Sequence, residues 1–264
     1  MYKEVLEITS RENPAYKELK QIVSDNQSKY IIAEGKKLFF EVLNSGLKIK
    51  KIFVQNNNWQ SLSQFLPDNI GIEIVYITNE LLSSVYTTES KPDNDELIIS
   101  VVEKPLWELK DLFKLRENIL FLENVQDPGN LGTIIRSVLA FEASGIVLSK
   151  NSVNPFNTKV VRASAGAVFK TPILAVSDNL TFIDFAKKEN YKIVSTSSKL
   201  KEKSNELKFS MPSVFMFGNE GSGLSHELLS VSDDVVMIPH SDKVESLNIA
   251  ISVSLLLWEA YKKK

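Results

Sequence analysis

Apolar residues recur with two different spacings in the first hundred residues of this 264-residue chain. Residues 14–25 and 34–46 place apolar side chains three or four positions apart, as an amphipathic helix does, and the second pattern stops at Gly46. Three short β-branched runs predict buried strands: 50–55, 72–77 and 96–102. The pattern therefore predicts a small α/β unit over residues 1–103.

The second half of the chain alternates strand and helix patterns. Apolar runs predict strands at 119–125, 145–150, 171–177, 191–198, 213–220 and 234–240. Helical spacing appears at 130–142, 157–169, 178–190, 223–230 and 246–263. Such alternation is typical of a mostly parallel sheet covered on both faces, with ligands bound outside the carboxyl ends of its strands. We expect a second α/β domain over 118–264 and a mixed-charge linker over 104–117.

Composition narrows the class of protein. The chain is 43% apolar and 24% charged, as soluble globular proteins are. Its longest apolar run, residues 247–258, is shorter than the roughly 18 residues of a membrane span and is interrupted by Asn and Ser. The charged N-terminus does not resemble a secretory signal, so we expect a cytoplasmic protein that makes no membrane contact. The absence of cysteine excludes disulfides, thiol nucleophiles and cysteine-based zinc sites.

The charge balance argues against a protein that coats nucleic acid. The net charge is −2, whereas such proteins are usually strongly basic. Residues 1–56 carry ten Lys and Arg against seven Asp and Glu, which leaves a mild local excess of positive charge. This balance is compatible with an enzyme that acts on nucleic acid through a local basic surface.

Three polar segments interrupt the second half of the chain. The first, "NVQDPGNLGTIIRS" at 124–137, follows an apolar strand, and its small residues predict a bend over 128–132 before Arg136. Two interpretations of this bend are open, a cradle for a phosphate group and a plain turn.

The second segment, "GNEGSGLS" at 218–225, is close to a phosphate-binding loop. Leu224 stands where that motif requires lysine, which disfavours a nucleotide triphosphatase. The dinucleotide fingerprint also fails, because His226 replaces its third glycine. A tight turn that leads into a helix remains the alternative, although Glu220 is then an unexplained carboxylate.

The third segment, "IPHSDKVESLNIAIS" at 238–252, leads into the last predicted helix. Ser246 is a candidate N-cap for that helix. Asn248 is a polar side chain that enters an otherwise apolar helix, where a buried amide requires partners.

Together the three segments resemble the signature motifs of the SpoU/TrmH family of RNA 2′-O-ribose methyltransferases, in the same order. "VRASAGAVFKTPI" at 161–173 is similar to the segment between the first two motifs. In the N-terminal half, "ITSRENPAYKELK" and "IIAEGKKLFFEVLNSG" are similar to the substrate-binding domain of the rRNA-modifying branch. Two positions differ, because the family more often has Met and Gly where this chain has His240 and Asp242.

The resemblance implies a mostly parallel catalytic sheet with a deep trefoil knot, an S-adenosylmethionine donor, and a homodimer whose active site uses both subunits. It also implies an RNA substrate, with rRNA favoured over tRNA because of the added N-terminal domain. A catalytically inactive RNA-binding protein of the same fold is the alternative.

The resemblance also implies the roles of individual residues. Arg136 would activate the ribose hydroxyl, although a guanidinium remains protonated at neutral pH, so we expect it to grip phosphate and stabilise developing negative charge. Glu220 would hold the arginine or orient substrate. The other predicted catalytic residues are Asn130, Ser246 and Asn248. The predicted cofactor-binding residues are Gly218, Ile238, Leu247, Phe217 and Thr196.

Two groups of residues remain. His226 and His240 have no metal-ligand spacing, so no metal site is predicted. In the N-terminal domain, solvated charge is the ordinary role of basic side chains, but five of them are candidates for contact with the RNA backbone: Arg11, Lys17, Lys20, Lys36 and Lys37.

Overall fold

The computed structural model describes residues 3–25, 27–66, 71–87, 97–197 and 212–263. The chain divides into two compact units. The N-terminal unit contains Met1–Leu106 and Phe156–Phe169, and the C-terminal unit contains Trp107–Pro155 and Lys170–Lys264. No helix of the described segments is long and apolar enough to cross a membrane.

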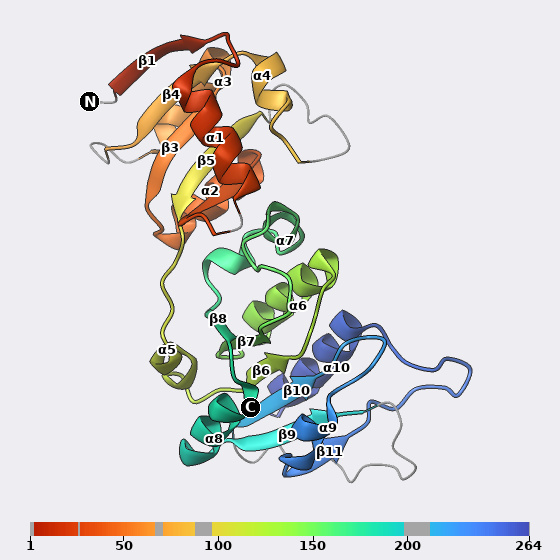
Figure 1. Cartoon of the computed structure of the whole chain (residues 1–264). Helices are drawn as coiled ribbons and strands as arrows, with labels where there is room; N and C mark the ends of the chain where they lie inside the picture. Colours follow the sequence, from red (N-terminus) through yellow and green to blue (C-terminus); the bar gives the residue numbers. More distant parts are fainter. Residues whose placement is uncertain (1–2, 26, 67–70, 88–96, 198–211, 264) are drawn as a thin grey trace. The chain divides into compact units, whose positions relative to one another are not determined.

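The N-terminal unit is built on a five-stranded sheet with the order β1-β4-β3-β5-β2 (Figure 1). Strand β5 runs antiparallel to both of its neighbours, whereas the other pairs are parallel. The strands are β1 (Lys3–Ile8), β2 (Tyr30–Glu34), β3 (Ile49–Val54), β4 (Glu73–Ile77) and β5 (Ile98–Glu103). The helices are α1 (Pro14–Ser24), α2 (Lys36–Ser45), α3 (Asn56–Leu62), η1 (Ser63–Phe65), α4 (Asn79–Ser83), α7 (Thr158–Ala163) and η3 (Ala167–Phe169).

The pattern of apolar residues predicted β3, β4, β5, α1 and α2, but it missed β1 and β2. Strand β2 ends at Glu34, a carboxylate whose side chain is only 1% exposed. The charge at Glu34 limits the apolar run to residues 31–33, which is too short to predict a strand.

The C-terminal unit is a fully parallel six-stranded sheet with the order β11-β9-β10-β6-β7-β8. The predicted α/β class with a parallel sheet is therefore confirmed, while the trefoil knot stays a prediction. The strands are β6 (Ile119–Leu122), β7 (Gly145–Ser149), β8 (Ile173–Val176), β9 (Lys192–Thr196), β10 (Ser213–Phe217) and β11 (Asp234–Val236). The helices are α5 (Leu109–Phe113), α6 (Pro128–Ala140), α8 (Asn179–Lys188), α9 (His226–Ser230) and α10 (Ile249–Tyr261).

The strand register of this sheet brings four strand ends together. Phe217, the last residue of β10, pairs with Leu122, the last residue of β6. Val236 of β11 pairs in the same way with Thr196 of β9. The loops that follow these strands therefore leave the sheet from one edge, which is where parallel α/β sheets bind ligands.

Two segments differ from the expected organisation. The expected linker over 104–117 contains the short helix α5, whose Leu112 and Phe113 are buried in the core of the C-terminal unit. The single helix expected over 157–169 is wrong. It is broken into α7 and η3 because Ala165 and Gly166 adopt left-handed backbone conformations, with φ of 50° and 89°. A side chain at position 166 would meet Glu41 Cβ at 2.6 Å, so glycine is required there.

A buried ion pair fixes the segment 156–169 within the N-terminal unit. Arg162 Nη1 lies 2.6 Å from Glu34 Oε2, and the arginine side chain is 26% exposed. Glu34 also accepts hydrogen bonds from the backbone N–H and the hydroxyl of Thr87, each at 3.1 Å. The carboxylate therefore joins three stretches of chain that are distant in sequence.

Substitution of Glu34 by alanine should lower the free energy of unfolding by about 2–4 kcal/mol, because it leaves the guanidinium of Arg162 mostly buried without its partner. Glu103 is the matched control, since its pair with Lys48 is exposed and should contribute less than about 1 kcal/mol. Urea denaturation measures both values. Equal losses for Glu34→Ala and Glu103→Ala would contradict this account.

The loop after β10 turns back on itself with very little room. Gly223 donates a backbone hydrogen bond to Asn219 at 2.8 Å and has a φ of 71°. A Cβ on Gly218 would lie 2.0 Å from the carbonyl carbon of Gly223, whereas a Cβ on Gly221 would meet nothing closer than 3.4 Å. The hairpin shape of this loop therefore depends on glycine at 218 but not at 221.

The substitution Gly218→Ala should open this loop and cost about 1–3 kcal/mol, because the new methyl group would overlap backbone atoms. The substitution Gly221→Ala should stay within about 0.5 kcal/mol of the wild type. Thermal denaturation provides the measurement. If both variants unfold at the wild-type temperature, the close approach at Gly218 is not required.

Candidate active site

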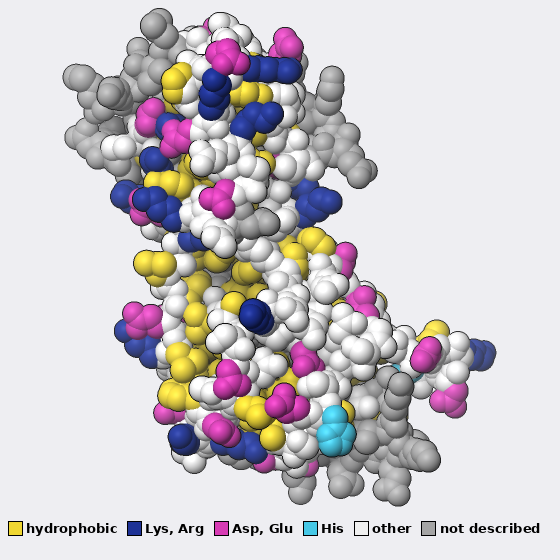
Figure 2. All heavy atoms as spheres, viewed as in Figure 1, with side chains coloured by type: hydrophobic (Ala, Val, Ile, Leu, Met, Phe, Trp, Pro, Cys, Tyr) yellow, Lys and Arg dark blue, Asp and Glu magenta, His cyan; other side chains and the backbone are white. Residues whose placement is uncertain are grey.

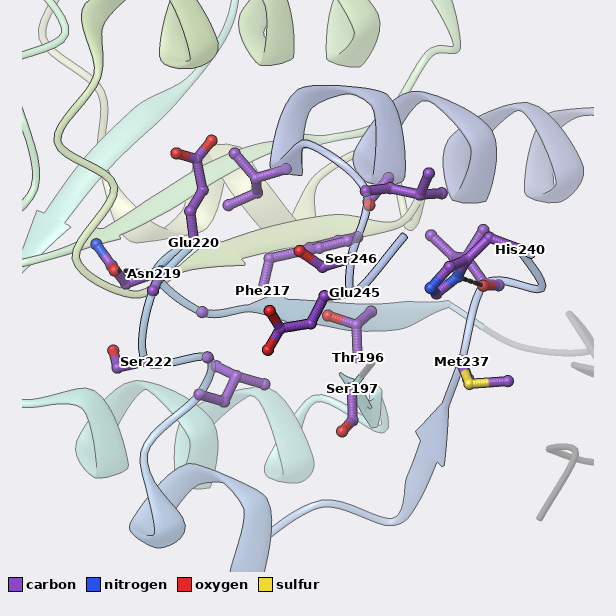
Figure 3. A pocket seen from close by; sticks show the side chains of 18 of the residues that line it. Thr196, Ser197, Phe217, Asn219, Glu220, Ser222, Met237, His240, Glu245 and Ser246 are labelled. Carbon is purple, nitrogen blue, oxygen red and sulfur yellow. Dashed lines mark hydrogen bonds between the residues drawn. The ribbon is translucent and has the colours of Figure 1, made fainter. Parts of the chain in front are cut away.

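A cavity of about 380 Å³ lies at the carboxyl ends of β9, β10 and β11 (Figure 3). Its wall combines loop backbone with apolar side chains, and two carboxylates border it. The lining residues used below are Thr196, Phe217, Gly218, Glu220, Leu224, Met237, Ile238, His240, Glu245, Ser246 and Leu247.

All five residues predicted to bind the cofactor line this cavity: Thr196, Phe217, Gly218, Ile238 and Leu247. They come from three separate strand ends and loops, which only the parallel sheet brings together. Leu224 stands in place of the phosphate-loop lysine and is a buried part of the wall. The cavity therefore presents an apolar surface at the position where a nucleotide triphosphatase would need a cation.

The polar residues of the three motifs meet beside the cavity. Asn248 donates from Nδ2 to Asn130 Oδ1 at 3.0 Å and to Glu220 Oε1 at 3.3 Å. Asn130 Nδ2 donates a short hydrogen bond to the same oxygen of Glu220. We call Asn130, Glu220 and Asn248 the amide–carboxylate cluster. It confirms that the three sequence motifs converge in space.

Helix ends hold two members of this cluster. The bend predicted over 128–132 is wrong, because Pro128–Ala140 is continuous helix. Asp127 caps this helix by accepting the backbone N–H of Asn130 at 2.7 Å, and Pro128 fits the first helical turn. Asn130 therefore has a fixed position at the start of α6.

The predicted N-cap of the last helix is also wrong. Asn248, not Ser246, caps α10, because its Oδ1 accepts the backbone N–H of Ala250 at 2.9 Å. The side-chain amide of Asn248 therefore has two roles. Its oxygen caps the start of α10, and its nitrogen donates hydrogen bonds within the cluster. Ser246 lines the cavity instead.

Arg136 does not belong to the cavity lining or to the cluster in this single chain. It lies on the exposed face of α6, about 9 Å farther along the helix axis than Asn130. Within the described residues it makes no hydrogen bond or ion pair, and Glu220 is held by two amides instead of by an arginine. A catalytic role for Arg136 stays a prediction.

Some site residues gave no sequence signal strong enough to single them out. Glu123 follows β6 and is only 6% exposed, and it accepts the backbone N–H of Ser225 at 2.7 Å. Asn219 donates to the carbonyl of Asn124 at 2.9 Å. These two contacts tie the loop after β10 to the end of β6. Asn219 stands within the second quoted motif and Glu123 directly precedes the first, but only their contacts reveal their role.

The two histidines differ in position. His240 lines the cavity, and its Nδ1 lies 2.8 Å from the carbonyl oxygen of Ile238. His226 begins α9. In the described part of the chain, no group of three or more His, Asp or Glu residues could hold a metal ion.

The five candidate RNA contacts of the N-terminal unit are all exposed. Lys17 pairs with Glu12 at 2.5 Å, and this contact lowers the pKa of the Glu12 carboxyl. On the face shown in Figure 2, Lys and Arg side chains over this unit are mixed with acidic ones. This unit therefore presents dispersed basic side chains on that face, and no single large basic patch.

Comparison with known proteins agrees with the site geometry. Two curated relatives from Bacillus subtilis (strain 168) match almost the whole chain. The putative TrmH family tRNA/rRNA methyltransferase YacO is 29% identical, over 90% of this chain and 97% of its own. The 23S rRNA (guanosine(2553)-2′-O)-methyltransferase RlmP is 28% identical, over 96% of this chain and 98% of its own.

A solved structure also matches both units. The AdoMet-bound rRNA methyltransferase from Sinorhizobium meliloti is 29% identical and superposes with a TM-score of 0.84, over 98% of each chain. The model of the SpoU rRNA Methylase family matches residues 117–258, which contain the cavity and the whole amide–carboxylate cluster. The chain therefore belongs to the SpoU rRNA Methylase family.

Proposed function

We propose that this protein transfers a methyl group from S-adenosylmethionine to a ribose 2′-hydroxyl of structured RNA, with rRNA favoured over tRNA. The observation that carries the proposal is the amide–carboxylate cluster beside a cavity in a chain of the SpoU family. The relative RlmP is named for 2′-O-methylation of a 23S rRNA guanosine, and the S. meliloti relative is AdoMet-bound. A cytoplasmic location is part of this proposal, since it fits a ribosomal RNA substrate.

The residues present fit S-adenosylmethionine. The cavity of about 380 Å³ falls within the range of roughly 300–1,000 Å³ that small-molecule sites occupy. Phe217, Leu224 and Met237 offer apolar surface to an adenine ring, while the backbone at Gly218, Ile238 and Leu247 offers hydrogen-bonding groups. When bound, the donor supplies an electrophilic methyl group. The protein must then position the acceptor oxygen.

The amide–carboxylate cluster suits that positioning role. Both amide donors reach Oε1 of Glu220, and within the described residues no hydrogen bond to Oε2 is present. Oε2 is therefore free to accept a hydrogen bond from a substrate hydroxyl and to orient its oxygen. Correct orientation of two reacting groups accounts for a large part of enzymatic rate enhancement. Ser246 also lines the cavity, and its hydroxyl offers a second hydrogen bond to the substrate hydroxyl.

Arg136 supplies fixed positive charge in this proposal. A guanidinium is a planar cation with several donors, so in this proposal Arg136 grips RNA phosphate and stabilises the oxygen as negative charge develops there. It lies on the exposed face of α6, one helical turn before the exposed Leu139. A partner that covers this face would therefore come close to Arg136.

A second copy of the chain is the partner that we propose. An apolar face, defined here as Leu139, Ile251, Leu255 and Trp258, lies on α6 and α10. These side chains are 42–53% exposed, and the three on α10 follow helical spacing along one side. Ser137 and Ser254 hydrogen-bond at 2.7 Å and hold the two helices together. A homodimer would cover this face and bring Arg136 beside the interface.

In the N-terminal unit, the start of α2 is well suited to bind an RNA phosphate. Gly35 provides no side-chain cap, so the first backbone N–H groups of the helix remain available. Lys36 and Lys37 add two exposed cations at the same end, where the helix dipole already favours an anion. Arg11, Lys17 and Lys20 are exposed around the start of α1 and are the other proposed contacts.

Methyl-transfer assays on ribosomal RNA should detect 2′-O-methylation that requires S-adenosylmethionine. Calorimetry should show binding of S-adenosylmethionine and not of ATP, because Leu224 replaces the phosphate-loop lysine. Donor binding with no methylation of any RNA tested would favour the inactive RNA-binding alternative. Binding of ATP alone would contradict the proposed function.

The substitution Arg136→Lys should lower kcat/KM at least about tenfold and leave donor affinity unchanged. Lysine keeps the positive charge but lacks the planar guanidinium group that can donate two parallel hydrogen bonds. Arg116→Lys is the matched control, because Arg116 hydrogen-bonds to Glu189 O outside the site and should retain full activity. The assay is methyl transfer under single-turnover conditions. Near-normal turnover of Arg136→Lys would contradict a role for the guanidinium.

The substitution Leu255→Asp should convert a dimer to monomers, because it places a charge in the middle of the apolar face. Leu115→Asp is the control, since Leu115 is 64% exposed but lies outside that face. Sedimentation velocity measures the oligomeric state. A wild-type monomer, or a Leu255→Asp variant that remains dimeric, would rule out this interface.

A further inference from the structure

The side chains that line the cavity carry an unbalanced negative charge. Glu220 and Glu245 both line it, and among the residues that the structure describes its lining contains no Lys or Arg. Figure 3 shows Glu245 pointing into the cavity, close to Thr196 and Ser246. The ring Nδ1 of His240 is directed at the carbonyl of Ile238. The cavity is therefore suited to a ligand that carries positive charge.

The two carboxylates are not equivalent. Glu220 is held by the side chains of Asn130 and Asn248. Glu245 makes no hydrogen bond or ion pair with any other described residue, and it is exposed before a ligand binds. A carboxylate that enters a binding cavity without a partner in the protein is available to a cation of the ligand.

The chemistry of the proposed reaction provides such a cation and then removes it. In methyl transfer the carbon–sulfur bond breaks, its electron pair remains on sulfur, a carbon–oxygen bond forms, and the hydroxyl proton passes to solvent water. The positively charged sulfonium of the donor becomes a neutral thioether in S-adenosylhomocysteine, while the ammonium and carboxylate of both ligands are unchanged. Donor and product therefore differ by one positive charge.

We propose that Glu245 makes this cavity selective for the donor over its product, because its carboxylate attracts the sulfonium charge that the product has lost. This inference rests on the proposed function. Glu245 contributes electrostatic attraction to a bound ligand and is a specificity residue. Its effect favours donor entry and product release at the same site.

The charge-neutral substitution Glu245→Gln provides the test. Opposite charges a few ångströms apart near a protein surface attract measurably, so the dissociation constant of S-adenosylmethionine should rise about threefold to tenfold. The dissociation constant of S-adenosylhomocysteine should change less than about twofold. Both are measured by isothermal titration calorimetry. The loss for the donor should shrink as salt is raised from 0.05 to about 0.5 M, because ions screen exposed charges.

Asp242→Asn is the matched control. Asp242 lies in the same loop and is exposed, but it does not line the cavity. This variant loses the same charge, so it should bind both ligands with wild-type affinity. An equal loss in Asp242→Asn would assign the effect to the overall charge of the loop and would overturn the proposal. Thermal denaturation of both variants establishes that they are folded.

The remaining outcomes separate this inference from the proposed function. If the wild type binds S-adenosylmethionine and Glu245→Gln weakens both ligands equally, or neither, then the selectivity does not come from Glu245, while the proposed function stands. If the wild type binds no S-adenosylmethionine, both proposals fail. A second readout is inhibition of methyl transfer by S-adenosylhomocysteine, which should become stronger relative to donor binding in Glu245→Gln.

Discussion

The hydrogen bonds among Asn130, Glu220 and Asn248 are the contact on which the rest of the site depends. Each residue belongs to a different polar segment, and a parallel sheet alone would leave these segments as separate loops. Asn130 lies in the first turn of α6 and Asn248 caps α10, so both side chains leave from backbone held at a helix start. The carboxylate between them accepts both amides, which places the loop after β10 against two rigid elements. The cavity wall at Gly218 and Glu220 takes its shape from this arrangement.

In the N-terminal unit a carboxylate also joins distant segments of the chain, but it stabilises the core of the unit instead of a site. Glu34 is buried, and the desolvation of a charge is costly unless a counter-charge and hydrogen bonds compensate. Arg162 and Thr87 provide that compensation. The arginine belongs to a segment that leaves the C-terminal sheet after β7 and returns to it at β8. A stretch inside the region matched by the SpoU family model thus completes the core of the N-terminal unit.

Local apolar patterns predicted most strands, and the family resemblance supplied the candidate cofactor-binding residues, whose role stays a prediction. Apolar runs identified every strand of the C-terminal sheet, and the family motifs placed Gly218, Ile238 and Leu247, which all line the cavity. The failures have different physical causes. Glu34 at the end of β2 pairs with Arg162, which is distant in sequence, and the break in the 157–169 helix follows from the left-handed conformations of Ala165 and Gly166. The N-cap of α10 was misplaced by two residues, because Ser246 and Asn248 are both residue types that cap helices.

The placement of α6 and α10 connects the site to the proposed dimer. Asn130 lies in the first turn of α6, and Asn248 caps the start of α10. Farther along, each helix exposes part of the apolar face. The two helices pack together and share the hydrogen bond between Ser137 and Ser254. A helix transmits a change of orientation along its whole length, because its backbone hydrogen bonds keep it rigid. A second copy that packs on the apolar face would therefore restrict both helix starts at once, and with them the geometry of Asn130, Glu220 and Asn248. Assembly of the proposed dimer would therefore influence the orientation of the acceptor oxygen.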